Sequence, residues 1–129
     1  MESSIKRLPD AELEVMLAVW EGDAPVHTGE ILRRVEASGK KTKLQAVQTL
    51  LSRLCDKGFL HCEKLGRLNY YHPLVQKDSY LAAETASFVE RVYDNSPARL
   101  IAALAGGYTF TAEELAELRA ILEREKGEQ

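Results

Sequence analysis

Side chains that can hydrogen bond to DNA bases recur at helical spacing between residues 43 and 57. The apolar residues of this segment define one buried helix face, made of Val47, Leu50, Leu51 and Leu54. The opposite face carries Lys43, Gln45, Ala46, Gln48, Thr49 and Arg53. Glutamine can pair with adenine, alanine and threonine methyls can contact thymine methyls, and cations can bind phosphates. The face is therefore a candidate surface for the DNA major groove, and a merely solvated helix face is the alternative.

A cysteine and histidine cluster raises a second kind of chemistry. Cys55, His61, Cys62 and His72 are residue types that ligate zinc or copper. His61 and Cys62 are neighbours on an expected strand and so point to opposite faces, and Cys55 lies on the apolar side of a helix. Buried, unreactive thiols and no metal site are therefore expected.

Catalytic patterns are absent from the sequence. There is no Gly-rich phosphate loop, no HExxH and no GxSxG, so neither enzymatic activity nor a cofactor is expected. The aromatic residues Trp20, Tyr70, Tyr71 and Phe88 are expected to fill a core rather than line a ligand pocket. Adjacent strand residues point to opposite faces, so one tyrosine is expected to be exposed, in contact with phosphate or with the partner protomer, and Tyr71 is placed among the DNA-binding residues.

Charge is unevenly distributed along the 129 residues, whose formal net charge is -3. Residues 33–67 contain nine basic and three acidic residues, a local charge of +6, whereas the chain from Gln76 onward has six basic and ten acidic residues. The basic segment is expected to meet an anion, and an unevenly charged surface is the alternative. Without an apolar leader or a run of ~20 apolar residues, a cytoplasmic protein with no direct membrane contact is expected.

The spacing of the apolar residues, and the capping and turn residues that separate the segments, predict a mainly α fold with a small β-hairpin. The expected helices run from about Pro9 to Trp20, from an N-cap at Thr28 to Ala37, from Lys43 to Lys57, from Lys77 to Asp94, from Ser96-Pro97 to Gly106-Gly107, and from a capping box at Thr111 and Glu114. FLHCEKL and LNYYHPLV flank Gly66-Arg67 as two strands. Residues 1–75 are predicted to form a winged helix-turn-helix domain, and residues 76–129 a helical dimerisation region that needs a partner surface.

The turn around Gly39 and the hairpin after the basic helix are typical of a winged helix-turn-helix, with Arg67 at the wing tip. The predicted DNA-binding residues are Lys41, Thr42, Lys43, Gln45, Ala46, Gln48, Thr49, Arg53, Lys57, Arg67 and Tyr71. The apolar residues predicted for dimerisation are Leu81, Phe88, Val92, Leu100, Ile101, Leu104, Leu115, Leu118 and Leu122.

Five segments carry a resemblance to a known family. LPDAELEVMLAVW, TGEILRRVE, KLQAVQTLLSRLCDKGFL and YYHPL resemble the BlaI/MecI/CopY repressors, and TAEELAELRAILE resembles their dimerisation region. The resemblance implies a homodimeric repressor that binds an inverted-repeat operator in double-stranded DNA, with half-sites of TACA/TGTA character. Gln45, Gln48, Thr49 and Arg53 match operator-contacting positions, although the first two stand where relatives often have cations.

Regulation departs from the family pattern at two places. In the β-lactam branch, a membrane sensor-transducer pathway leads to cleavage by a protease at an Asn-Phe bond, and the matching positions here are Ala103 and Leu104. The copper branch has a C-terminal cysteine cluster, whereas no cysteine follows Cys62. Two other functions remain as alternatives: a winged-helix regulator gated by a small ligand, and a protein-interaction winged helix that does not bind DNA.

Overall fold

The computed structural model describes residues 6–127, with side chains described up to residue 124. The chain divides into two compact units, one up to Thr85 and one from Ala86 onward. The elements, in chain order, are α1 (Asp10–Glu21), β1 (Val26–His27), α2 (Thr28–Ala37), α3 (Leu44–Asp56), β2 (Leu60–Leu65), β3 (Leu68–Pro73), α4 (Lys77–Val92), α5 (Pro97–Gly107) and α6 (Ala112–Gly127). The expected mainly helical fold with a small antiparallel sheet is confirmed.

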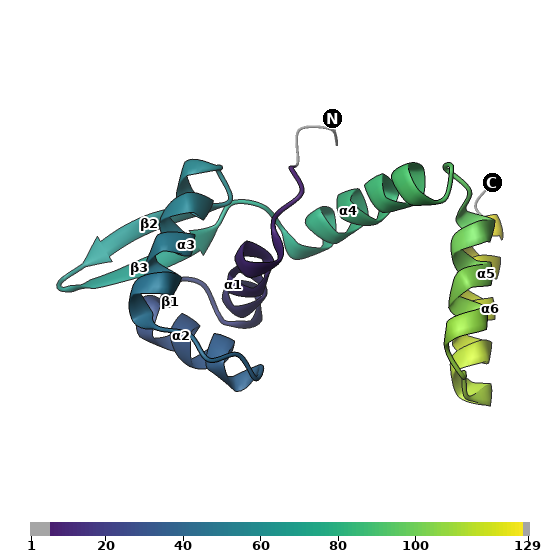
Figure 1. Cartoon of the computed structure of the whole chain (residues 1–129), viewed down its shortest axis with the longest axis horizontal. Helices are drawn as coiled ribbons and strands as arrows, with labels where there is room; N and C mark the ends of the chain where they lie inside the picture. The colour runs from purple at the N-terminus through teal and green to yellow at the C-terminus, as the bar shows by residue number, and fades with distance from the viewer. Residues whose placement is uncertain (1–5, 128–129) are drawn as a thin grey trace. The chain divides into compact units, whose positions relative to one another are not determined.

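The first unit packs three helices against a three-stranded sheet with the strand order β1-β3-β2 (Figure 1). Helices α1, α2 and α3 all contact one another, and α3 also contacts β2. The centre of the core is fully buried and consists of Met16, Val19, Ile31, Val47, Leu51 and Leu54. Residues from all three helices thus share one apolar core, as a helix-turn-helix requires.

The β2–β3 hairpin extends from this core as the wing (Figure 1). Its register runs from Leu60 opposite Pro73 to Leu65 opposite Leu68, and Gly66 turns the chain with a φ of 64°. A positive φ costs glycine little because it has no Cβ. The predicted hairpin and its two-residue turn are confirmed.

A short strand and a histidine cap were not predicted. Strand β1 pairs Val26 with Tyr71 and His27 with Tyr70. The His27 Nδ1 atom accepts hydrogen bonds from the backbone N–H groups of Gly29, at 3.1 Å, and Glu30, at 3.4 Å. The N-cap of α2 is therefore His27 and not Thr28. A two-residue strand has no periodicity to detect, and histidine is not among the preferred N-cap residues.

The helices of the second unit begin as expected. Ser96 caps α5 by accepting from Arg99 N, and Pro97 occupies the first turn. Thr111 and Glu114 form the predicted capping box, in which each side chain accepts from the backbone N–H of the other. The apolar side chains of α5 and α6 are largely exposed, and α5 has no buried residue.

Helix α4 contributes residues to both units. Tyr80 in its first half is only 1% exposed and belongs to the core of the first unit, which extends to Thr85. The compact winged-helix unit is thus longer than the predicted domain of residues 1–75. The buried aromatic ring of Tyr80 explains the difference, because it docks the start of α4 onto the first unit.

A buried carboxylate joins α1 to the end of α3. Glu12 is 4% exposed, and its Oε1 atom accepts a hydrogen bond from Lys57 Nζ. The Lys57 side chain is about one-third exposed. The two partners therefore differ in their access to water once the pair is broken.

Removal of Lys57 should destabilise the protein more than removal of the Glu12 charge. Lys57→Met leaves a buried carboxylate without its counter-charge, with an expected loss of about 3 kcal/mol in the free energy of unfolding. Glu12→Gln leaves an ammonium that can reach water, and the expected loss is about 1 kcal/mol. Urea unfolding followed by the fluorescence of Trp20, the single tryptophan, measures both losses.

Lys40→Met is the matched control, because Lys40 is exposed and Glu14 keeps about a third of its side chain in water, so the Lys40–Glu14 pair should contribute under about 0.5 kcal/mol. Equal losses for Lys57→Met and Glu12→Gln would contradict the assignment of Glu12 as the buried partner.

Candidate DNA-binding surface

The outer face of α3 presents the side chains expected there. Val47, Leu51 and Leu54 are fully buried, and Leu50 is half-buried against the core. The predicted outer residues Lys43, Gln45, Ala46, Gln48, Thr49 and Arg53 are all exposed, as are Leu44, Ser52 and Asp56. The predicted division of this helix into a core face and a solvent face is confirmed.

Hydrogen bonds within α3 leave both glutamine side chains available. The Thr49 hydroxyl donates to the Gln45 carbonyl at 3.0 Å, so its methyl is the group left for an apolar contact. Among the described residues, the side-chain amides of Gln45 and Gln48 have no hydrogen-bond partner within the chain. Each amide has an NH₂ group that donates and an oxygen that accepts, side by side, which matches the edge of adenine.

The beginning of α3 is electropositive. Gly39, with a φ of 102°, ends the turn after α2, and the loop continues through Lys41, Thr42 and Lys43. Lys41 and Lys43 are exposed, and Thr42 is half-buried. The first turn of α3 has no acidic residue, so the positive end of the helix dipole is not neutralised there. Backbone N–H groups at such an end are suited to phosphate.

Ion pairs sort the nine cations of residues 33–67 into two groups. Arg34 pairs with Glu30 and Glu21, Lys40 with Glu14, and Lys57 with Glu12. The hydrogen bond from Arg34 lowers the pKa of Glu30, so this pair stays charged at neutral pH. In the part of the chain that the structure describes, no ion pair is formed by Arg33, Lys41, Lys43, Arg53, Lys64 and Arg67.

Lys57 was predicted to contact DNA phosphate, and the structure instead places its ammonium on Glu12. The sequence did not indicate this ion pair, because Glu12 lies 45 residues away and nothing local marks it as a buried acid. Arg33 and Lys64, in contrast, are exposed cations that the predicted set left out. The local charge of +6 was their only signal in the sequence.

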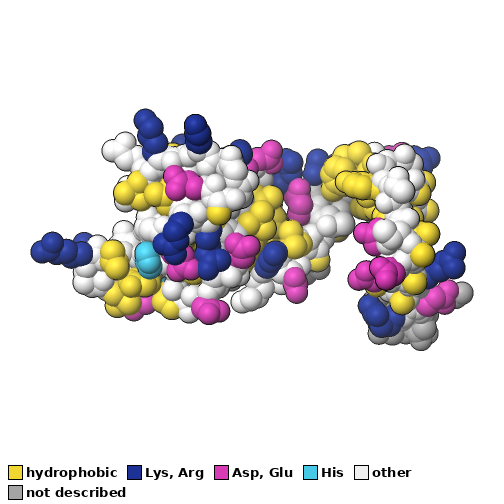
Figure 2. All heavy atoms as spheres, turned by 90° about the horizontal axis from the view of Figure 1, so that it is seen from below, with side chains coloured by type: hydrophobic (Ala, Val, Ile, Leu, Met, Phe, Trp, Pro, Cys, Tyr) yellow, Lys and Arg dark blue, Asp and Glu magenta, His cyan; other side chains and the backbone are white. Residues whose placement is uncertain are grey.

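The wing adds a second cationic contact point. Arg67 is exposed in the hairpin turn, and Lys64 is exposed on β2. Figure 2 shows a dark blue side chain at the far left end of the molecule, where Figure 1 draws the hairpin tip. Leu65 and Leu68 beside the turn are about half exposed. The wing tip thus combines positive charge with apolar side chains, as predicted for Arg67.

Tyr71 does not belong to this surface. It pairs with Cys62 and Val26 on the core face of the sheet and is 6% exposed. Burial, followed by the nearby Cys62 thiol, raises the pKa of Tyr71 to about 12. Its neighbour Tyr70 lies on the outer face with its ring 5.8 Å from that of His27. The alternation of the two tyrosines was predicted correctly, but their assignment to the two faces was reversed.

Comparison with known proteins identifies the family. The model of the penicillinase repressor family matches residues 8–124. This chain belongs to the penicillinase repressor family.

Individual relatives support the same conclusion. The penicillinase repressor of Bacillus licheniformis is 30% identical over 122 residues, which cover 95% of this chain and 94% of that protein. The methicillin resistance regulatory protein MecI of Staphylococcus aureus strain N315 is 24% identical, and the match covers 96% of this chain and 99% of that protein. The solution structure of the DNA-binding domain of the repressor BlaI is 33% identical, with a TM-score of 0.51 over 59% of this chain and 90% of that one. The family consists of repressors and not enzymes, as the sequence indicated.

The apolar residues predicted for dimerisation remain largely uncovered in the single chain. Leu100 is half-buried, and the other eight are exposed, from Leu118 at 36% to Leu122 at 56%. Yellow side chains are correspondingly visible on the helices of the second unit in Figure 2. Ile121 and Tyr108, at 38% and 66%, belong to the same exposed apolar set, which the prediction did not include. Ile121 could have been predicted from the helical spacing of the apolar residues in α6.

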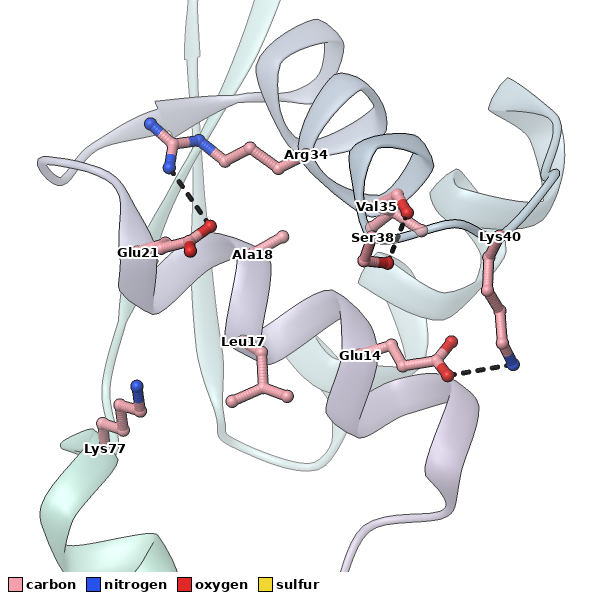
Figure 3. Close-up of a pocket in the computed structure, with 9 residues that line it drawn as sticks. All are labelled: Glu14, Leu17, Ala18, Glu21, Arg34, Val35, Ser38, Lys40 and Lys77. Carbon is pink, nitrogen blue, oxygen red and sulfur yellow. Dashed lines mark hydrogen bonds and ion pairs between the residues drawn. The ribbon is translucent and has the colours of Figure 1, made fainter.

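One open pocket lies within the first unit, between α1, α2 and the first turn of α4 (Figure 3). Its volume is about 480 Å³, and Leu17, Ala18 and Val35 contribute apolar lining. Its charged groups largely pair with one another, Glu14 with Lys40 and Glu21 with Arg34. Such a lining has few free polar groups to orient a ligand, so the pocket gives little support to the ligand-gated alternative.

The two thiols differ in exposure. Cys62 is exposed on β2, contrary to the expectation of a buried thiol, whereas Cys55 is half-buried. Burial raises the pKa of the Cys55 thiol. His72 Nε2 lies 2.8 Å from Glu63 Oε1, but the described residues contain no group of three or more metal-ligating side chains. The described residues also contain no helix long and apolar enough to cross a bilayer.

Alkylation should distinguish the two thiols. We expect iodoacetamide to react with Cys62 at least about tenfold faster than with Cys55 in the folded protein, because Cys55 is less accessible and its thiolate is less populated. Intact-mass spectrometry over time resolves the two additions. Cys62→Ser should remove the fast phase, and urea should make both thiols react alike. Two equally fast additions to the folded protein would contradict this assignment.

Proposed function

We propose that the chain is a homodimeric transcriptional repressor that binds an inverted-repeat operator in double-stranded DNA. One observation carries the proposal: free amide and cationic side chains gather on the outer face of α3 and on the wing, while other cations of the same segment are neutralised by acids. The proposed DNA-binding residues are Lys41, Thr42, Lys43, Gln45, Ala46, Gln48, Thr49, Arg53 and Arg67. The repressor names of the relatives support the same function.

Helix α3 is the proposed major-groove element. Gln45 and Gln48 pair with adenines, and Ala46 and the Thr49 methyl contact thymine methyls. This chemistry suits half-sites of TACA/TGTA character, which contain three A·T pairs in four. Lys43 and the positive end of α3 bind phosphates on one side of the groove, and Arg67 binds the backbone from the wing. The phosphate contacts fix the position of the protein on the duplex, and the glutamine amides determine which base sequence is bound.

The exposed apolar side chains of α4, α5 and α6 form the proposed dimer interface. A set of side chains this apolar on separate helices is an unfavourable surface in water, and a second copy offers the same surface in return. A symmetric dimer presents two α3 helices to two half-sites. When one protomer binds its half-site, the effective concentration of the second protomer at the other half-site rises. The affinity of the dimer for the whole operator therefore exceeds that of one protomer for one half-site.

Repression follows when the dimer occupies a promoter in the cytoplasm, and release follows when the dimer weakens. By analogy with the relatives, the regulated genes serve antibiotic resistance. A sensor-transducer pathway with a protease fits this logic because Ala103 and Leu104 lie inside α5, beside the interface residues Leu100 and Ile101. Cleavage there would remove α6 from the chain and divide the apolar surface.

Fluorescence anisotropy tests the function directly. A labelled duplex with an inverted repeat of TACA/TGTA half-sites is titrated with protein beside a scrambled duplex, at several salt concentrations. We expect two protomers per duplex, at least about a hundredfold preference for the repeat, and a steep salt slope. Equal, weak binding to both duplexes would oppose this operator, and fragments selected by the protein from random DNA would then separate a different operator from a protein-interaction module.

Substitutions on α3 should weaken operator binding without affecting folding. Gln48→Ala should lose about tenfold in affinity for the repeat, because one bidentate base contact contributes about 1–3 kcal/mol. Arg53→Ala should weaken binding to all duplexes and lower the salt slope by about one per protomer. The matched controls are Gln76→Ala and Arg119→Ala, which alter exposed residues outside α3. A lost thermal transition in either α3 variant would contradict the assignment of its outer face.

A charge in the apolar surface should dissociate the dimer. Leu118→Glu places a carboxylate where a partner would bury a leucine, so we expect a shift from dimer to monomer and at least about a tenfold loss of affinity for the repeat. Leu74→Glu is the matched control, since Leu74 is 58% exposed and lies in the first unit. Analytical ultracentrifugation measures the association state. A Leu118→Glu protein that remains dimeric would exclude α6 from the interface.

A further inference from the structure

Leu44 differs from the other large apolar residues of α3. Val47, Leu51 and Leu54 are fully buried in the core of the first unit, and Leu50 packs against that core. Leu44 is the first residue of the helix, and its side chain is 45% exposed. A large apolar group therefore meets water at the start of the helix that is proposed to enter the major groove.

Helix capping does not explain a leucine at this position. Lys43 is the N-cap residue of α3, and its carbonyl accepts a hydrogen bond from Val47 N at 3.1 Å. A hydrophobic staple pairs the residue before the N-cap with the fourth helical residue, and these are Thr42 and Val47 here. Leu44 occupies neither position. An exposed side chain with no role in the core or the cap is available for contact with another molecule.

The surroundings of Leu44 suit an anionic partner that also carries an apolar group. The loop just before it contains Lys41 and Lys43, which are exposed and form no ion pair with the residues that the structure describes. Gln48 lies one helical turn after Leu44 and therefore on the same side of the helix. A partner at this point must offer negative charge, hydrogen bonds and an apolar surface together.

The major groove of DNA offers this combination at thymine, whose C5-methyl group projects into the groove between phosphates. One helical turn advances about 5.4 Å, and base pairs stack about 3.4 Å apart. When α3 follows the groove, Leu44 and Gln48 can therefore contact base pairs one or two steps apart. Half-sites of TACA/TGTA character contain adenines and thymines at such separations.

Building on the proposed function, we propose that Leu44 is a specificity-determining residue that contacts the C5-methyl group of one thymine in each half-site. The contact removes apolar surface of both groups from water, and this gain is lost when the base lacks the methyl. Each protomer of the dimer makes one such contact, so a symmetric operator loses it twice. Leu44 thus selects a thymine, whereas Gln45 and Gln48 select adenines.

Uracil in place of thymine tests the contact, because it removes only the methyl and keeps the pairing with adenine. The probe is the labelled inverted repeat of TACA/TGTA half-sites, in which one thymine at a time is replaced in both half-sites. Fluorescence anisotropy measures the affinity of the full-length protein for each duplex. Leu44→Ala is compared with the wild type and with Leu74→Ala, a matched control that shortens a leucine 58% exposed outside α3 and the wing.

We expect the wild type and Leu74→Ala to lose about tenfold in affinity at one thymine position, since each methyl contact contributes about three- to fivefold and the operator has two. Leu44→Ala should bind the unmodified duplex at least about tenfold more weakly. It should then lose less than about twofold when uracil replaces that thymine, because two groups in contact have non-additive effects. Thymines assigned to Ala46 and Thr49 should keep their wild-type effect in Leu44→Ala.

Circular dichroism separates base contact from folding. The melting midpoint of Leu44→Ala should lie within about 3 °C of the wild-type value, because shortening an exposed side chain rarely alters stability. Leu44→Met keeps an apolar side chain of similar volume and should restore the effect of uracil at the same position. A Leu44→Ala protein without a cooperative transition would show that Leu44 supports the fold, and would overturn the proposal.

The remaining outcomes separate the contact from the function on which it rests. A wild type that prefers the repeat but binds all uracil duplexes as tightly as the unmodified one overturns the Leu44 contact and leaves the repressor function intact. A Leu44→Ala protein whose response to uracil equals that of the wild type at every position does the same. A wild type that does not distinguish the repeat from a scrambled duplex overturns the proposed operator, and with it the inference built on that operator.

Discussion

Burial of the apolar side of α3 is the constraint on which the rest of the structure depends. Val47, Leu51 and Leu54 are fully buried, and each buried side chain of this kind contributes about 2 kcal/mol to stability. Rotation of the helix about its axis would expose them, so the orientation of α3 is fixed by the core. The outer residues Gln48 and Arg53 are presented as a direct consequence, without any contact of their own to hold them.

The acids of α1 complement this constraint by sorting the positive charge. Glu12 and Glu14 pair with Lys57 and Lys40, so two lysines that flank α3 in sequence have acidic partners in α1. Within residues 33–67, all of which the structure describes, the cations without an ion pair lie on the outer side of α3, in the loop before it and on the wing, and one further cation, Arg33, lies on α2. The positive surface potential is therefore concentrated where the unpaired cations lie, since a surface potential depends on which charges lack partners more than on their total.

Local and periodic features of this sequence were predictable, and contacts between distant segments were not. The two faces of α3, the wing hairpin and the Thr111–Glu114 capping box each depend on residues a few positions apart. The pairing of Lys57 with Glu12 and the docking of Tyr80 on Leu8 join residues 45 and 72 positions apart. Tyr70 and Tyr71 show the same limit in a strand. Alternation separates their faces, but only the pairing of Tyr71 with the buried Val26, 45 residues earlier, shows which face is the core.

The two units differ in how far they bury their own apolar side chains. The first unit has a complete core of its own, whereas α5 and α6 leave Ile101, Leu118 and Leu122 exposed. A unit without a sufficient core depends on a partner, so its structure is sensitive to protomer concentration and to damage at the interface. Helix α4 belongs to both units, with Tyr80 packed in the first unit and Val92 exposed in the second. The buried ring of Tyr80 therefore anchors the first half of α4 in the first unit, whereas Phe88 and Val92 in its second half stay exposed like the apolar side chains of α5 and α6.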